Sequence, residues 1–287
     1  MKVADWKDYS IIATGNGYKL ERWGKIHLLR PDPQVIWDSS IDLEKHPQLD
    51  AKYIRSESGG GRWDFKNKIP QEWTIGYNDL KFKIKPMGFK HTGLFPEQAV
   101  NWELMQELIK NSKREISVLN LFAYTGGATV ACAKAGAKVT HVDSAKAMVE
   151  RAGENIRLSG LQDAYVRYII DDCKKFTERE IRRGKKYDAI IMDPPSYGRG
   201  PNGEMWKIES ELFSLVTLCE KVLSDNPLFF LINSYTTGLQ PQVLKNILNL
   251  AITQKRGGSV DAYEVGLKTQ QEGVVLPCGN SGLWKNI

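Results

Sequence analysis

Residues 118–129, which read VLNLFAYTGGAT, decide the fold of this chain. An apolar run ends there in a turn at Gly126 and Gly127, and a segment of helical character follows as far as Ala135. A buried strand, a tight turn and a helix start, in this order, are how α/β proteins hold a nucleotide. The stretch therefore predicts a nucleotide-type site at the end of a strand.

A second strand with a terminal carboxylate supports this interpretation. Residues 138–142 are typical of a short buried strand, and Asp143 follows them 16 positions after Gly127. A carboxylate at this place can accept hydrogen bonds from both ribose hydroxyls of an adenosine. The pair predicts a Rossmann-type site and leaves the cofactor open.

Strand-like and helix-like segments alternate from Ser117 to the end of the chain, which predicts an α/β fold with a seven-stranded, doubly wound sheet. The expected strands are 118–123, 138–142, 165–170, 187–192, 228–233, 260–267 and 273–277. The expected helices are 125–135, 145–158, 174–183, 207–223 and 241–254. Ligands of such sheets bind at the carboxyl ends of the strands, where the glycine turn and several aspartates are expected.

The first 87 residues have a different character. They hold five of the eight tryptophans and no long helical period, and short strand-like runs are expected at 9–14, 26–29, 35–37, 74–77 and 80–84. Residues 80–84 alternate apolar and basic side chains, which predicts a strand with one buried face. We expect a small β-rich domain over 1–87 and a Rossmann-like domain over 88–287. Most tryptophans of the β-rich domain are expected in the core of that domain, with stacking on nucleic-acid bases as the alternative.

The composition favours a cytoplasmic protein without a membrane segment or a metal site. No apolar run approaches the ~18–20 residues needed to cross a bilayer, and the first residues lack the apolar core of a signal peptide. The four cysteines are widely spaced, and the four histidines have no metal-ligand spacing. The net charge of +6 mildly favours an anionic partner such as nucleic acid.

The glycine turn fits a nicotinamide cofactor poorly. In the pattern G-x-G-x-x-G, Tyr124 stands in place of the first glycine and Thr129 in place of the third. The same architecture also binds S-adenosylmethionine. The segment DPPSY at 193–197 lies at the end of the fourth expected strand.

The whole of 117–195 resembles the class I methyltransferase pattern. Within that class, NLFAYTGG at 120–127, TGLFPEQ at 92–98 and DPPSYGRG at 193–200 resemble the subgroup that includes the bacterial 23S rRNA large-subunit methyltransferases. The resemblance extends from about Gly88 to the C-terminus, and the β-rich segment is similar to the small domain that precedes the catalytic domain in that subgroup. It implies S-adenosylmethionine as the cofactor and RNA, ribosomal RNA first, as the substrate.

The resemblance also implies which residues bind the cofactor. The backbone that passes the methionine part is that of Phe122, Ala123, Tyr124, Thr125, Gly126 and Gly127. Asp143 and Ser144 are matched to the ribose, and Asp172 and Cys173 to the adenine. Three alternatives stay open: Asp171 in place of Asp172, Ser144 as a helix N-cap, and Phe122 and Tyr124 as core residues or as cation–π partners of the sulfonium. Cys173 is expected as a pocket wall and not as a nucleophile.

The resemblance assigns catalysis to the loop formed by Asp193, Pro194, Pro195, Ser196 and Tyr197, and it counts Asp193 among the cofactor-binding residues as well. Two prolines stiffen this loop, whose carbonyls can accept hydrogen bonds from a target amino group. Ser196 separates the prolines from Tyr197, so the pattern of adenine methyltransferases is imperfect. Methylation of cytosine C5 needs a thiolate, and the two known cysteine positions hold Ser196 and the segment 233–237. We therefore expect direct transfer to nitrogen or oxygen without a cysteine nucleophile.

Beyond this loop, Arg199, Lys207 and the segment 198–203 are expected to contact phosphate, with a plain surface loop as the alternative. No role is assigned to 276–284. Other functions also remain open: methylation of a small molecule or a protein side chain, an NAD-dependent oxidoreductase, and an RNA-binding module with a degenerate pocket.

Overall fold

The computed structural model describes residues 1–56, 60–88, 90–199 and 205–286. The chain forms two compact units. The first comprises Met1–Val100 and Gly266–Cys278, and the second comprises Asn101–Val265 and Gly279–Ile287. The β-rich domain expected over 1–87 lies within the first unit, which also includes residues 88–100 and 266–278.

The first unit is built on a five-stranded sheet of order β2-β3-β4-β5-β6, together with a hairpin of β7 and β8. Three of the expected strands are confirmed as β2, β4 and β8 and a fourth as β7, whereas 35–37 forms no strand, so that prediction is wrong. Strands β3, β5 and β6, in which polar side chains stand among the apolar ones, were not predicted from the sequence. The strands are β2 Tyr9–Gly15, β3 Tyr18–Trp23, β4 Ile26–Pro31, β5 Ala51–Arg55, β6 Gly61–Phe65, β7 Trp73–Tyr77 and β8 Leu80–Ile84, and the short helix η1 is Leu43–Lys45.

Side chains of the first unit follow two different patterns. In β8 the apolar Leu80, Phe82 and Ile84 are buried, as the alternation predicts. Only Trp23 among the tryptophans of 1–87 is fully buried. The indole N–H groups of the half-buried Trp6 and Trp63 donate to the carbonyls of Pro96 (2.9 Å) and Met87 (2.7 Å). These indoles therefore fasten loops of the unit and are less buried than expected.

The larger sheet has eight strands in the order β1-β16-β17-β15-β12-β9-β10-β11. All seven expected strands form, and the two-residue β1 adds an eighth. The last strand runs on to Lys285, so most of 276–284 is sheet, with Leu283 and Trp284 buried. The strands are β1 Lys2–Val3, β9 Ser117–Leu121, β10 Lys138–Asp143, β11 Val166–Ile170, β12 Ala189–Met192, β15 Phe229–Ser234, β16 Ser259–Lys268 and β17 Val275–Lys285.

The five strands β15, β12, β9, β10 and β11 are parallel, and β17 pairs antiparallel with β15. Every residue of β12 and β15 is buried, as expected of central strands covered on both faces. The chain leaves β9 toward β10 on one side and returns to β12 on the other. The strand order therefore reverses at β9, and ligands of doubly wound sheets bind at that point.

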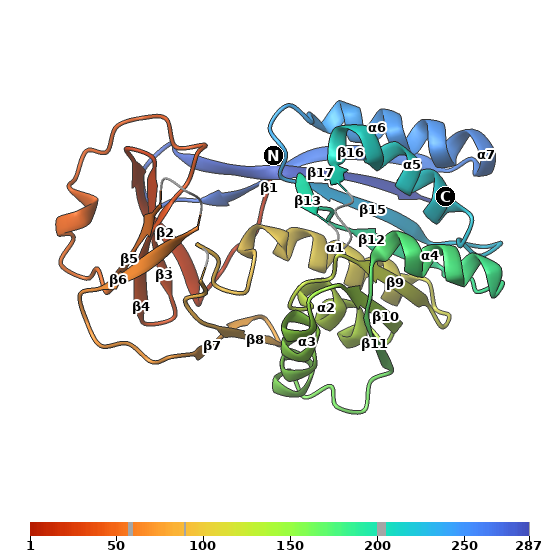
Figure 1. The fold of residues 1–287 in the computed structure, drawn as a ribbon, viewed down its shortest axis with the longest axis horizontal. Helices are drawn as coiled ribbons and strands as arrows, with labels where there is room; N and C mark the ends of the chain where they lie inside the picture. Colours follow the sequence, from red (N-terminus) through yellow and green to blue (C-terminus); the bar gives the residue numbers. More distant parts are fainter. Residues whose placement is uncertain (57–59, 89, 200–204, 287) are drawn as a thin grey trace. The chain divides into compact units, whose positions relative to one another are not determined.

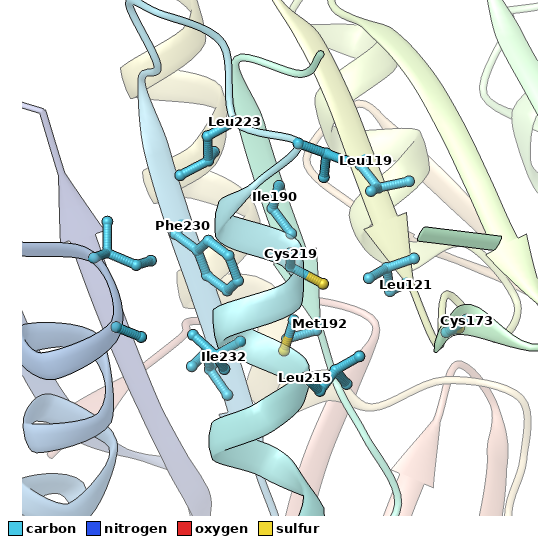
Figure 2. Close-up of a cluster of buried hydrophobic side chains, with 14 of the residues drawn as sticks. Leu119, Leu121, Cys173, Ile190, Met192, Leu215, Cys219, Leu223, Phe230 and Ile232 are labelled. Atoms are coloured by element: carbon cyan, nitrogen blue, oxygen red, sulfur yellow. The ribbon is translucent and has the colours of Figure 1, made fainter. Parts of the chain in front are cut away.

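Helices cover both faces of this sheet (Figure 1), with α2 and α3 on one face and α4, α5 and α6 on the other. Figure 2 shows α5 lying over the sheet, with Leu215 and Cys219 close to Ile190, Met192 and Phe230. The helix after Pro241 contains a π-helical turn. The helices are η2 Pro96–Gln98, α1 Ala99–Asn111, α2 Gly127–Lys134, α3 Lys146–Leu158, α4 Cys173–Arg182, α5 Ile208–Glu220, α6 Pro241–Leu248, η3 Asn249–Thr253 and α7 Gln254–Arg256.

In the parts of the chain that the structure describes, none of the helices combines the length and the apolar character that a membrane crossing requires.

Candidate active site

Strand register brings the predicted loops to one edge of the sheet. Leu121 of β9 pairs with Met192 of β12 on one side and with Val142 of β10 on the other. Phe122, Asp143 and Asp193 therefore follow three adjacent strands at the same level. This is the edge at the reversal of strand order, where the sequence places its site residues.

The loop after β9 has an unusual backbone. Phe122 (φ 55°), Tyr124 (φ 48°) and Gly126 (φ 83°) all adopt left-handed conformations. For residues other than glycine this region costs free energy and is held only by the surrounding structure. Here the Ala123 N–H donates to the Val142 carbonyl (3.1 Å) and the Gly126 N–H to the Ala123 carbonyl (2.9 Å). Such strained backbone is typical of a ligand-binding turn.

A chain of buried polar side chains braces this loop from below. The Asn120 amide donates to Thr129 Oγ1 (2.9 Å), which lies 2.9 Å from His141 Nδ1. The Asn155 amide donates to the Thr125 carbonyl (2.9 Å). Burial lowers the pKa of His141 to about 4, so its ring is neutral at physiological pH. The loop conformation is thereby fixed by the core of the fold.

Asp143 joins two of these segments. Its Oδ2 accepts the Tyr124 N–H (2.8 Å) and its Oδ1 accepts the Ala145 N–H (2.9 Å). A carboxylate oxygen can accept a second hydrogen bond, so both oxygens retain capacity for a ligand hydroxyl. Ser144 is exposed and does not cap α3, whose N-cap is Ala145, so the alternative of Ser144 as the cap is wrong.

Two neighbouring aspartates follow β11, and they differ. Asp171 forms an ion pair with Arg179 and accepts the Asp172 N–H (2.8 Å). Asp172 is exposed, and its Oδ1 caps α4 by accepting the Lys175 N–H (2.9 Å). Within the described residues, Asp172 Oδ2 has no hydrogen-bond partner, and Ile170 beside it is 51% exposed. Asp172 therefore offers an available carboxylate oxygen beside an apolar side chain, a combination that suits an aminopurine ring. Asp171 suits it less well, because its carboxylate is already paired with Arg179.

Cys173 forms a wall between these loops. Its Sγ accepts the Phe122 N–H at 3.2 Å and lies 3.9 Å from the Val142 carbonyl. Burial raises the pKa of this thiol well above its usual value, and the pKa of Cys219 is raised to about 12. Since the thiolate is the nucleophilic form, both thiols are unreactive at neutral pH.

The loop after β12 is more exposed. Asp193 is half-buried and Pro194 buried, whereas Pro195, Ser196 and Tyr197 are exposed. The loop leads into a hairpin of β13 (Tyr197–Arg199) and β14 (Met205–Lys207). Residues 200–204 and the side chain of Arg199 lie outside the described part of the chain, so the phosphate contacts expected there are not placed. Lys207 is exposed.

Sequence reasoning missed two residues that hold this loop. The Trp206 indole N–H donates to the Pro195 carbonyl (2.6 Å), and the hydroxyls of Ser196 and Thr236 lie 2.6 Å apart. The Trp206 ring also packs on Phe122, with 5.9 Å between the ring centroids. A tryptophan in a polar segment just after a glycine-rich loop was the available signal.

The family follows from comparison with known proteins. The sequence model described as S-adenosylmethionine-dependent methyltransferase matches residues 36–238. A solved structure of a SAM-dependent methyltransferase from Agrobacterium tumefaciens is 32% identical, with a TM-score of 0.93 over 100% of this chain and 94% of that one. The chain belongs to the S-adenosylmethionine-dependent methyltransferase family. The nicotinamide alternative is thereby set aside.

Curated relatives of this methyltransferase match only in part. Ribosomal RNA large subunit methyltransferase K/L from Pseudoalteromonas atlantica is 31% identical over 193 residues, or 67% of this chain and 26% of that protein. A putative ribosomal RNA large subunit methyltransferase from Methanocaldococcus jannaschii is 35% identical over 154 residues, or 52% of this chain and 38% of that protein. The chain thus spans about a quarter to two fifths of the length of these relatives.

The residues at the sheet edge fit the cofactor of a methyltransferase. The left-handed loop, the Asp143 carboxylate and the available oxygen of Asp172 offer polar groups from three adjacent strand ends. The exposed Ile170 offers an apolar surface beside them. Among the described residues, no group of three or more His, Cys, Asp or Glu side chains is placed to hold a metal ion.

Proposed function

We propose that this methyltransferase transfers the methyl group of S-adenosylmethionine to a nitrogen or oxygen atom of RNA, with ribosomal RNA as the first candidate. The observation that carries the proposal is the register of β9 with β12, which sets the loop at Phe122 beside the loop at Asp193. The names of the partial relatives and the net charge of +6 support RNA as the acceptor.

The donor half of the site is assigned to the loops after β9, β10 and β11. The left-handed backbone of Phe122–Gly127 borders the methionine part of the cofactor. Asp143 accepts hydrogen bonds from the ribose hydroxyls, with the exposed Ser144 beside it. Asp172 accepts a hydrogen bond from the adenine amino group through its available oxygen, and Cys173 lines the ring.

The acceptor half is assigned to Asp193, Pro194, Pro195, Ser196 and Tyr197. The Pro195 carbonyl already accepts the Trp206 indole, whereas the Pro194 carbonyl has no partner among the described residues. We therefore assign the Pro194 carbonyl and the Asp193 carboxylate to the N–H or O–H of the target atom. Bound S-adenosylmethionine would supply the methyl group and would leave as the neutral thioether with the electron pair of the carbon–sulfur bond, and the target proton would pass to Asp193. The sulfonium is a good leaving group, so alignment supplies most of the catalysis.

No cysteine takes part in this reaction. Segments 193–199 and 233–237 contain none, and the buried Cys173 and Cys219 are protonated at neutral pH. RNA carrying 5-fluorocytidine traps enzymes that add a thiolate to cytosine C6. We expect no covalent adduct with such RNA, and an adduct stable in denaturant would contradict direct transfer.

The decisive experiment uses RNA from cells that lack this protein. Ribosomal subunits and free rRNA from such cells are incubated with the purified protein and S-adenosylmethionine, and the nucleosides are analysed by mass spectrometry. We expect one methylated nucleoside to appear, and we expect the enzyme to work in the cytoplasm. Methyl incorporation into small molecules or protein, with none into RNA, would overturn the assignment of RNA.

A further inference from the structure

Trp206 contacts both halves of the site. Its indole N–H donates to the Pro195 carbonyl at 2.6 Å, and its ring packs on Phe122 at 5.9 Å with 44° between the ring planes. Phe122 is the first residue of the donor loop, and Pro195 lies in the middle of the acceptor loop. One half-buried side chain therefore fixes the distance between two loops that leave different strands.

The hairpin register explains why Trp206 faces inward. Opposite residues of an antiparallel pair lie on the same face, and Trp206 pairs with Gly198, whereas the exposed Tyr197 pairs with Lys207. Trp206 thus shares its face with Gly198, where an added Cβ would lie 3.8 Å from the Trp206 Cβ, an ordinary contact. Tyr197 and Lys207 are on the opposite face, toward solvent.

Thr236 holds the same loop from the other side. Its hydroxyl lies 2.6 Å from that of Ser196, and its backbone N–H donates to Ser234 Oγ (3.2 Å) at the end of β15. Behind Ser234, Asn233 Oδ1 accepts hydrogen bonds from the Asn101 amide (3.1 Å) and the Ser281 hydroxyl (2.8 Å). These groups are buried and hydrogen-bonded to one another, so the segment that leads to Thr236 is held firmly in place.

We propose that Trp206 and Thr236 are positioning residues that hold the acceptor loop in register with the donor loop. The indole ties Pro195 to Phe122, and the threonine hydroxyl ties Ser196 to the end of β15. The proposal rests on the proposed function, because that function makes 193–197 the acceptor loop. Neither residue contacts the reacting atoms in this scheme, and both act through the loop that they hold.

Two further consequences follow from these bonds. A carbonyl that accepts the indole is turned away from the target atom, which leaves the Pro194 carbonyl to face it. The single methyl group must travel in line from sulfur to acceptor, so a loop that drifts by about 1 Å lowers the rate without weakening cofactor binding. Loss of either bond should therefore reduce kcat and leave the affinity for S-adenosylhomocysteine unchanged.

The test uses the full-length protein and four variants. Trp206→Phe keeps an aromatic ring on the side of Phe122 and removes the N–H together with part of the indole, a loss of volume that the Trp284→Phe control shares. Thr236→Val keeps the shape and removes the hydroxyl, whereas Thr236→Ser keeps the hydroxyl. Trp284→Phe is the matched control, since Trp284 also donates its indole N–H to a backbone carbonyl, that of Gly257 (2.9 Å), away from this loop. Each variant is measured for amide hydrogen exchange at 196–198, S-adenosylhomocysteine affinity by calorimetry, and methyl transfer to rRNA.

We expect Trp206→Phe and Thr236→Val each to accelerate exchange at 196–198 by about 10-fold, the effect of one lost hydrogen bond. We expect kcat to fall by a similar factor while the Kd for S-adenosylhomocysteine changes by less than about 2-fold, and Thr236→Ser to behave like the wild type. Unchanged exchange, cofactor affinity that falls together with kcat, or the same effects in Trp284→Phe would overturn the proposal. If the wild type methylates no RNA, the proposed function fails, and the exchange and affinity measurements still decide the role of the two residues.

Discussion

The donor loop and the acceptor loop of this methyltransferase lie side by side and are held in different ways. The donor loop at 122–127 has left-handed residues in its backbone and is held in that conformation by buried polar side chains. The acceptor loop at 193–197 is exposed and is held by an indole and a hydroxyl from neighbouring segments. One loop is built into the core of the fold, and the other is fastened to it from outside.

This difference matches what each loop binds in the proposed function. The methyl donor is the same molecule in every member of the family, so its site can be fixed by buried residues. Acceptors differ among methyltransferases, and a loop held by a few surface contacts can change without disturbing the core. The comparison predicts that substitutions in the donor half affect stability and cofactor affinity, whereas those in the acceptor half affect rate and substrate.

The largest effect is expected for Gly126→Ala. Gly126 has φ 83°, and a Cβ there would lie 2.8 Å from the Cβ of Ala152 on α3. The left-handed backbone and the steric overlap together should cost about 3 kcal/mol of unfolding free energy. Urea denaturation measures the loss, and calorimetry should find S-adenosylhomocysteine binding strongly weakened.

The control for this prediction is Gly136→Ala. Gly136 has φ 91°, but a Cβ there would have no atom within 4 Å among the described residues. It should cost about 1 kcal/mol, the backbone penalty alone, and leave cofactor binding intact. Equal losses in the two variants would show that α3 does not brace the donor loop.

The next effect is expected for Asp143→Asn. The substitution keeps the size of the side chain and removes the charge that accepts the Tyr124 N–H and, in our assignment, the ribose hydroxyls. Hydrogen bonds to a charged group contribute ~1.5–3 kcal/mol, so the Kd for S-adenosylhomocysteine should rise about 10- to 100-fold. Asp171→Asn is the control, because Asp171 is paired with Arg179, and its Kd should change by less than about 2-fold. A larger effect at Asp171 than at Asp143 would contradict the assignment of the ribose hydroxyls to Asp143.

The donor half could be predicted from sequence because its signals are local. An apolar strand, a glycine pair and an aspartate at the end of the next strand follow one another within 30 residues, and each follows from backbone geometry. The hydrogen bonds that hold the donor loop in place could not be predicted from the sequence. Thr129 and His141 lie on different elements, and their contact exists only because α2 folds back onto β10.

That bracing can be tested by pH. His141 has its pKa lowered to about 4 by burial, below the usual value near 6.5. Between these values the unfolded chain binds a proton that the folded protein does not, so the free energy of unfolding falls as the pH falls. From pH 7 to pH 5 this group alone should remove about 2 kcal/mol. In His141→Gln this share of the pH dependence should be absent, as measured by urea denaturation at both pH values. Identical pH dependence in the two proteins would contradict a neutral buried His141.

The acceptor half and the N-terminal unit were harder to predict, for a physical reason. Trp206 and Thr236 act across 11 and 40 residues of chain, and no sequence period connects them to Pro195 and Ser196. In the N-terminal unit, β6 carries mostly exposed side chains, so the alternation that marks a half-buried strand is weak there. Long-range contacts and exposed strands leave little trace in local sequence, whereas the fully buried strands β12 and β15, with their long apolar runs, were evident.

The smallest effect is expected for Lys207→Ala, on the solvent face of the β13–β14 hairpin. If the acceptor is RNA, an exposed lysine beside the acceptor loop neutralises a phosphate, and its loss should weaken RNA binding about 2- to 5-fold and reduce the slope of log K against log salt by about 1. Cofactor affinity should not change, because Lys207 is exposed and is not among the residues assigned to the donor half. Lys110→Ala removes the same charge from an exposed position of α1 and should leave the slope nearly unaltered. Filter binding of rRNA at several salt concentrations measures both variants, and equal slopes for the two would mean that Lys207 contributes only to the overall charge of the protein.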